Sequence, residues 1–404
     1  MPMRPFASTI TLDEARRRLD ASVRPITRVE RVPLEAAAGR VAAADVVSPI
    51  DVPPFARSAM DGYAVVAADT SGASKTAPAR LRLVDRIYTA QVSSVAIAPG
   101  SCAEIATGAP LPAGADAVVM VEETAKNGDG NVDVFAVAHP GQNVGRRAGD
   151  IAAGDSVVAA GDLFTPSRVG AVAAIGGTAV DVFERPRVAI LSTGNEIVEP
   201  GRPLAPGQIY DVNRFTLEAI VEAHGGIAEA RRPVEDTVDA LIGSLDGCAG
   251  ADLIVFSGGS SVGERDLLVD AIAARGQMVF HGIAVRPGKP TAFAIIGGTP
   301  FFGMPGNPTS CLSNAYILLV PFLRALAHLP PYTPRTLRMP LGRRIASAVN
   351  RHQFYTVTVR DGVAQPAFKG SGDITSLSRA DGYIEIPADQ SVVEEGALVM
   401  VTFF

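Results

Sequence analysis

Several short segments combine glycine or proline with polar residues, a composition typical of loops that bind phosphate-like anions. FSGGSSVGERD, residues 256–266, follows an apolar run. Its backbone could approach a ligand closely at three glycines, namely Gly258, Gly259 and Gly263. Ser260 and Ser261 add hydroxyl donors. The segment has neither the Lys-Ser/Thr ending of a Walker A loop nor the GxGxxG spacing, so a plain strand-to-helix turn is the alternative.

A second segment places two cations on a stiff turn. Arg286 and Lys289 stand three residues apart in IAVRPGKPTAF, residues 283–293, and the flanking prolines exclude a helix there. The chain has four lysines among its 36 basic residues, so a lysine in this turn is notable. An anion contact and a solvated turn are equally compatible with the pattern. FFGMPGNPTS, residues 301–310, is a similar loop, with Asn307 before a proline that could begin a helix.

Carboxylates supply the complementary half of such a site. They stand near predicted strand ends or helix starts and comprise Glu196, Asp211, Glu235, Asp236 and Asp266. Each alone is most simply a helix cap or first-turn partner, which contributes about 0.5–2 kcal/mol. Several of them beside phosphate-type loops would suit Mg²⁺ bridging a phosphate ester. Three further rigid, polar segments lie upstream and contain Asp61, Thr107 and Asp150. By themselves they do not indicate a particular reaction.

The elements that must position these loops change character along the chain. A capping box of Thr11 and Glu14 predicts a helix through Val23. Alternating apolar residues predict strands over 81–158, a small β-rich module. A proline-rich linker follows residue 328, and the β pattern returns from 337 to 404.

The middle of the chain predicts a parallel sheet covered on both faces. Apolar strands at 187–191 and 253–257 alternate with predicted helices. Asn213 would cap one of these helices, which would end at residue 223. A further helix fits 309–326. Ligands gather at the carboxyl ends of parallel strands, so we expect the loops after Leu191, Ser257 and Met304 to line one cleft.

Composition narrows the class of protein. The chain has 404 residues, 47% hydrophobic and 19% charged, enough for several packed domains. The net charge of −6 argues against a protein that coats nucleic acid or an anionic membrane. Three scattered cysteines suit neither a disulfide framework nor a zinc knuckle. No signal peptide is visible, and the longest apolar stretch, near residues 316–326, is too short for a membrane span, so we expect a cytoplasmic protein.

Eight segments together resemble one family. They occur in family order and are PPFARSAMDGYAV, IATGAPLPAGADAVVMVEE, GRRAGDI, LSTGNEIVEPG, GQIYDVNR, SGGSSVGERD, RPGKPTAF and FGMPGNP. The chain thereby resembles the MoeA family of molybdopterin molybdenumtransferases, which includes the E domain of gephyrin. The resemblance extends from about residue 10 to the C-terminus.

The resemblance implies a homodimer of four-part subunits with multi-domain α/β plus β architecture. Residues 1–53 and 139–179 would form a discontinuous N-terminal domain, and 54–138 an inserted β-rich domain. Residues 180–328 would form a MogA/MoaB-like three-layer α/β domain that binds molybdopterin, and 329–404 a small C-terminal β-barrel-like domain. In the family, the α/β domain of one subunit meets the inserted domain of its dimer mate at the active-site cleft.

The implied reaction inserts molybdenum from molybdate into adenylylated molybdopterin and releases AMP, with Mg²⁺ as cofactor. The implied catalytic residues are Asp61, Thr107, Asp150, Glu196 and Asp266. The implied substrate-binding residues are Ser257, Gly258, Gly259, Ser261, Gly263, Arg286, Lys289, Pro305, Gly306 and Asn307. The implied metal ligands are Asp211, Glu235, Asp236 and Asp266. Other molybdenum cofactor biosynthesis proteins would be possible partners, and nucleic acid and membrane are not expected.

The chain departs from the family at several positions. Arg286 stands where lysine is usual, Ser260 where valine is usual, and Glu235 in place of an aspartate. Thr356 replaces an arginine that the family commonly uses to contact molybdate. Two other functions stay open: adenylylation of molybdopterin, which the same type of α/β domain performs elsewhere, and a non-catalytic scaffold of the gephyrin E type.

Overall fold

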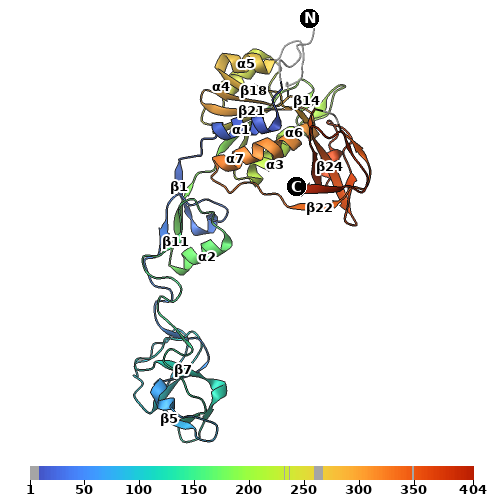
Figure 1. Ribbon diagram of the computed structural model, residues 1–404. Helices are drawn as coiled ribbons and strands as arrows, with labels where there is room; N and C mark the ends of the chain where they lie inside the picture. The colour runs from blue at the N-terminus through green and yellow to red at the C-terminus, as the bar shows by residue number, and fades with distance from the viewer. Residues whose placement is uncertain (1–8, 232, 236, 259–266, 348–349) are drawn as a thin grey trace. The chain divides into compact units, whose positions relative to one another are not determined.

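The computed structural model describes residues 9–404 apart from 232, 236, 259–266 and 348–349 (Figure 1). The chain forms two compact units. The larger comprises residues 1–30, 39–41 and 183–404, and the smaller comprises 31–38 and 42–182. The finer division into four domains stays a prediction.

A six-stranded mixed sheet forms the centre of the larger unit. Four neighbouring strands are parallel, in the order β16 (Ile227–Ala230), β13 (Arg187–Ser192), β17 (Leu253–Ser257) and β21 (Thr299–Met304). The sheet continues with two antiparallel strands, β20 (Ala292–Ile296) and β18 (Gly276–His281). The expectation of a purely parallel sheet was therefore wrong at this edge. Only Gly297 and Gly298, both at positive φ, separate β20 from β21, and so short a connection can join only antiparallel strands.

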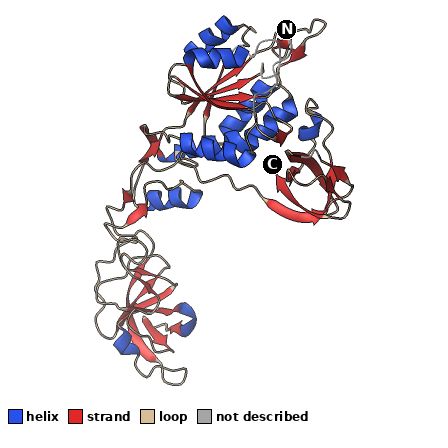
Figure 2. Ribbon diagram, turned by 45° about the horizontal axis from the view of Figure 1, so that its top comes forward, coloured by secondary structure: helices blue, strands red, loops and turns tan. Residues whose placement is uncertain are grey.

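Helices cover both faces of this sheet, which gives the predicted three layers (Figure 2). One face packs against α1 (Leu12–Ser22), α3 (Asn213–Ala223), α6 (Pro308–Asn314), the π-helical segment η4 (Ala315–Leu319) and α7 (Val320–Leu326). The other packs against α4 (Val238–Asp246) and α5 (Leu267–Arg275). Strand β13 shows why: Val188 and Ile190 face the first layer, whereas Ala189 and Leu191 face the second.

Residues 308–326 form one continuous helical stretch through α6, η4 and α7. In the part of the chain that the structure describes, it alone is long and apolar enough to cross a membrane. However, 72% of it is buried, and its side chains belong to the core beside the sheet. Its apolar character is therefore that of a core helix.

A second sheet lies at the C-terminal end of the same unit, in the order β19, β24, β26, β28, β22, with β25 also paired to β24. Its strands are β19 (Val285–Arg286), β22 (Thr336–Pro340), β24 (His352–Arg360), β25 (Val363–Pro366), β26 (Gly382–Ile386) and β28 (Leu398–Phe403). A separate pair joins β23 (Ile345–Ala346) to β27 (Val392–Val393), and a short helix, α8, spans Thr375–Ser378. Strand β19 lies between β18 and β20 in the chain but pairs with β24, so the C-terminal sheet includes one strand from the segment that builds the central sheet.

The smaller unit is built mainly of strands. Its largest sheet has the order β7 (Ala117–Met120), β4 (Gly62–Val65), β6 (Ser101–Ile105), β5 (Ala79–Ile87), β9 (Asn131–Val134) and β8 (Thr124–Lys126). Short pairs join β2 (Val46–Val47) to β11 (Ser156–Val158) and β3 (Arg57–Ser58) to β10 (Val144–Gly145). The helix α2 (Pro166–Ala174) packs beside them on a separate small core.

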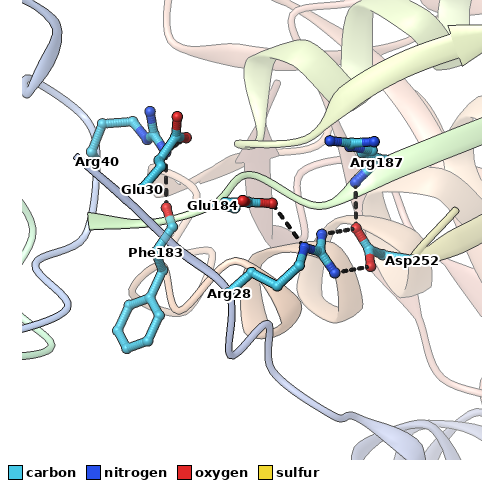
Figure 3. A network of polar contacts seen from close by, with 7 residues as sticks. All are labelled: Arg28, Glu30, Arg40, Phe183, Glu184, Arg187 and Asp252. Carbon is cyan, nitrogen blue, oxygen red and sulfur yellow. Dashed lines mark hydrogen bonds and ion pairs between the residues drawn. The ribbon is translucent and has the colours of Figure 1, made fainter. Parts of the chain in front are cut away.

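An arginine network within the larger unit fixes the segments where the chain passes to and from the smaller one, along β1 (Val29–Pro33) and β12 (Ala179–Phe183) (Figure 3). The Arg28 guanidinium donates to both oxygens of Asp252, at 2.9 and 2.8 Å, and to Glu184 at 2.8 Å. Asp252 also accepts from the backbone N–H of Arg187. The two carboxylates, Asp252 foremost, raise the pKa of Arg28, as expected for a bidentate pair.

Candidate functional site

A cavity of about 1100 Å³ opens at the carboxyl ends of the central parallel strands of the larger unit. Its floor is formed by the residues that end β13, β17 and β21, namely Ser192, Thr193, Ser257, Gly258, Pro305, Gly306 and Asn307. The prediction that the loops after Leu191, Ser257 and Met304 line one cleft is therefore confirmed. Topology alone brings these residues together, because parallel neighbours end at the same edge.

Glycine is required where these loops touch. Gly258 has a φ of +120°, and a Cβ there would lie 2.3 Å from the carbonyl oxygen of Thr193. A Cβ on Gly306 would make only an ordinary contact, 3.6 Å from the Cα of Gly258, so the requirement for glycine applies to Gly258. The three strand ends therefore meet backbone to backbone, which leaves amide groups close to any bound ligand.

Asn213 joins two of these strand ends. Its side-chain amide donates to the Ser257 hydroxyl and to the Gly306 carbonyl, both at 2.7 Å. The expectation that Asn213 caps α3 was wrong, because it is the first residue of the helix and its side chain bonds to the cavity floor. Asp211 satisfies the helix terminus instead, since its carboxylate accepts from the backbone N–H of Arg214 at 3.0 Å.

Asp211 itself is 4% exposed. Its second carboxylate oxygen accepts from the Ser192 hydroxyl at 2.7 Å. Both oxygens of Asp211 thus have protein donors, and the residue orients Ser192 at the end of β13. Its predicted role as a metal ligand stays a prediction.

Among the residues that the structure describes, four cationic side chains line the cavity. Arg286 and Lys289 belong to the predicted turn, whereas Arg351 and Lys369 come from the C-terminal sheet region. The second pair was not predicted from the sequence, because no short motif surrounds Arg351 or Lys369. The scarcity of lysine was the one available signal for Lys369. Two carboxylates, those of Glu196 and Asp211, line the cavity among the described residues, so cations predominate.

Hydrogen bonds hold the C-terminal region against this cavity. Strand β19 pairs with β24, which places Arg286 opposite Gln353. The Asn307 amide donates to the Ser371 hydroxyl at 3.0 Å, and the Thr309 hydroxyl donates to the carbonyl of Asp373 at 2.6 Å. Both contacts lie within one compact unit, so the cations from the two sheets face one space.

The predicted residues divide by location. Within the cavity lie Glu196, Asp211, Ser257, Gly258, Arg286, Lys289, Pro305, Gly306 and Asn307. Glu235 is exposed and does not line it. Outside the described residues lie Asp236, Gly259, Ser261, Gly263 and Asp266.

The remaining predicted residues belong to the smaller unit. Asp61 is exposed, and one of its carboxylate oxygens accepts from the backbone N–H of Thr107 at 2.7 Å and from its hydroxyl at 2.9 Å. These bonds, the backbone one foremost, hold the pKa of Asp61 below its ordinary value. Asp61 lines a hollow of about 160 Å³ with Arg86, Tyr88 and Glu104 among others. Asp150 is exposed on a loop of the same unit.

Comparison with known proteins covers the chain almost from end to end. Residues 10–176 match the MoeA N-terminal region (domain I and II). Residues 189–325 match the probable molybdopterin binding domain, and 338–404 match the MoeA C-terminal region (domain IV).

Individual relatives give the same result as the family matches. Molybdopterin molybdenumtransferase 2 of Mycobacterium tuberculosis is 38% identical over 397 residues, covering 94% of this chain and 95% of the relative. Molybdopterin molybdenumtransferase of Haemophilus influenzae is 32% identical, covering 98% of each chain. The crystal structure of a molybdopterin biosynthesis MoeA protein from Pyrococcus horikoshii is 37% identical, with a TM-score of 0.86 over 98% of this chain and 99% of that one. The chain therefore belongs to the MoeA family.

Proposed function

We propose that the chain is a molybdopterin molybdenumtransferase of molybdenum cofactor biosynthesis, which inserts molybdenum from molybdate into adenylylated molybdopterin and releases AMP. The observation that carries this proposal is the cavity at the strand ends, with Arg286, Lys289, Arg351 and Lys369 around a floor of hydroxyl and amide groups. Both substrates are anions, and charge-assisted hydrogen bonds to oxyanions are the strongest contacts that such side chains make.

The cavity also accounts for a departure from the family. Thr356 is 2% exposed, pairs with Tyr383 in the C-terminal sheet and does not line the cavity. Arg351 and Lys369 do line it from the same sheet region. We propose that these two cations supply the molybdate contact that an arginine at position 356 commonly makes in the family.

The donor set in the cavity fits Mg²⁺ in part. Among the described residues, no group of three or more His, Cys, Asp or Glu side chains stands close enough to hold a metal. Glu196 is exposed and lines the cavity, and Mg²⁺ commonly takes one or two carboxylates together with substrate phosphates. Glu196 would therefore hold the ion beside the phosphate groups. Bound there, Mg²⁺ would neutralise charge on the phosphoanhydride.

The chain's own residues would bind and orient the substrate. Arg286 and Lys289 would bind phosphate oxygens, and the backbone at Gly258 and Gly306 would approach the ligand closely. The exposed apolar side chains of Leu204 and Ile209 line the rim of the cavity and would cover less polar parts of the ligand.

We also propose a homodimer in which Asp61 of a second copy serves this cavity. Mixing Asp61→Asn and Lys289→Gln subunits tests the idea at substrate concentrations well below KM, where each variant alone should be only weakly active, because a mixed dimer would then contain one intact site. Random exchange should restore about one quarter of wild-type activity. A mixture that stays as weakly active as its two components although exchange is complete would contradict the shared site.

The central experiment incubates the purified chain with adenylylated molybdopterin, molybdate and Mg²⁺ and follows AMP. Molybdate-dependent AMP release is the expected result. Pyrophosphate release from ATP and molybdopterin would instead indicate the adenylyltransferase reaction. Binding without turnover would favour a scaffold.

A further inference from the structure

A fully buried asparagine contacts the backbone of the cationic turn but does not line the cavity. Asn314 is the last residue of α6 and is 0% exposed. Its amide nitrogen donates to the Gly288 carbonyl at 2.8 Å and to the hydroxyl of Thr291. The Thr291 hydroxyl donates in turn to the same carbonyl at 2.9 Å, and Thr291 is also 0% exposed.

The orientation of this amide is fixed by chemistry. The Gly288 carbonyl can only accept, so the NH₂ group of Asn314 must face it. The buried Asn314 carbonyl oxygen has no hydrogen-bond partner within the described part of the chain. An unpaired buried acceptor is destabilising, so the stabilising contribution of this side chain comes from the hydrogen bonds of its NH₂ group.

Asn314 holds the turn that carries two of the four cations. Gly288 has a φ of +99°, and a Cβ there would lie 2.2 Å from the Asn314 amide nitrogen, so the amide packs directly on the turn. The backbone N–H of Ile283 donates to the carbonyl of Lys289 at 2.9 Å. Between these contacts, the backbone that carries Lys289 has little freedom.

The same helix links this turn to another wall of the cavity. Helix α6 begins next to Asn307, which lines the cavity, and ends at Asn314, which does not. Directly after Asn314 the helix becomes π-helical, an irregularity that often accompanies functional sites. The asparagine therefore acts on the cavity only through the turn.

We propose that Asn314 and Thr291 are positioning residues. Their buried hydrogen bonds to Gly288 hold Arg286 and Lys289 in place to bind an anionic substrate, which Asn314 and Thr291 themselves do not touch. The inference rests on the proposed function. A cation whose backbone is held in advance loses less entropy when it binds an anion, so the effect should appear in substrate affinity.

The test compares Thr291→Val with Thr291→Ser, which keeps the hydroxyl. The matched control is Thr70→Val in the smaller unit, because Thr70 is also 0% exposed and its hydroxyl also makes two hydrogen bonds, to Ala67 and Ala138. Thr291→Val should raise KM for adenylylated molybdopterin roughly tenfold with kcat within about twofold, whereas the serine variant and the control should match the wild type. Calorimetric titration with inorganic pyrophosphate should show the same loss of affinity without catalysis.

Asn314→Ala provides a second variant that keeps the bond from Thr291 to Gly288, so it should fold even if Thr291→Val does not. It should also raise KM and weaken pyrophosphate binding. Unchanged KM and pyrophosphate affinity in folded Asn314→Ala would overturn the inference, as would an equal rise in Thr70→Val. A wild-type chain that does not release AMP would overturn the proposed function instead.

Discussion

Replacing Gly258 with alanine tests whether the strand ends must meet backbone to backbone. The φ of +120° is one that an L side chain adopts at a cost of about 1–2 kcal/mol. The new Cβ would lie 2.3 Å from the Thr193 carbonyl oxygen, and such overpacking costs about 1–3 kcal/mol. These costs are offset by about 0.4–1 kcal/mol of unfolding free energy, because alanine leaves the unfolded chain fewer conformations than glycine does. The net loss in unfolding free energy should therefore be about 1–5 kcal/mol.

The matched control is Gly176→Ala. Gly176 has a φ of +83°, but a Cβ there meets nothing within 4 Å, so it reports the backbone strain without the clash. Its net cost should be about 0–1.6 kcal/mol, so the clash should separate the two variants by about 1–3 kcal/mol. Urea unfolding followed by circular dichroism suits both variants, because the chain has no tryptophan.

Activity should separate the variants further. Relief of the clash must move Thr193 or the turn at Gly258, and both line the cavity. A displacement of that size should lower kcat/KM for AMP release by about a hundredfold, whereas Gly176→Ala should leave it unchanged. Equal stability and equal activity of the two variants would refute the close-approach argument.

Three further predictions concern charge. Lys289→Gln should raise KM for adenylylated molybdopterin at least about tenfold, since it removes a charged donor; an unchanged KM in AMP-release kinetics would contradict this. Thr107→Val should move the pKa of Asp61 part of the way back to its ordinary value, because the backbone N–H remains, and Thr107→Ser should not; NMR titration of labelled aspartate measures both. Burial, aided by the charge of Arg324, lowers the pKa of His224 below 6.5, so below that pH the unfolded chain binds more protons and stability should fall. His224→Gln should flatten this decline in thermal melts recorded between about pH 7.5 and 5.5, and an unchanged slope would contradict it.

The sequence was sufficient where local rules and topology agree. The N-cap half of the predicted capping box was correct, since the Thr11 hydroxyl accepts from the backbone N–H of Glu14 and α1 begins at residue 12, whereas the Glu14 carboxylate accepts from Arg17 and Arg18. The shared cleft followed from continuous apolar strands and their polar ends at Ser192 and Ser257. Both inferences use short-range signals whose consequences are fixed by geometry.

The sequence was insufficient where tertiary contacts choose between equal local options. Asn213 suits a helix cap by residue type, but Asp211 fills that role and frees the amide to join Ser257 to Gly306. Arg351 and Lys369 lack any motif and reach the cavity through tertiary contacts, namely the pairing of β24 with β19 and the hydrogen bonds from α6 and its preceding residue to the segment after Lys369. Asn314 lies within an apolar helix pattern, and no local signal separates it from an ordinary core position.

Cationic and neutral polar groups occupy different positions around the cavity. Its cations stand at the border between the two sheets of the larger unit, where Arg286 pairs with Gln353, so their charged ends keep access to solvent or ligand. The groups that hold this region from behind are neutral amides and hydroxyls, and Asn314, Thr291 and Ser257 are nearly or fully buried. Burial of a neutral group is affordable once it is hydrogen-bonded, whereas burial of an unpaired charge is not. A site built in this way can bind strongly charged substrates while its cations stay accessible, and the buried carboxylate of Asp211 is stabilised by a hydrogen-bond donor on each oxygen.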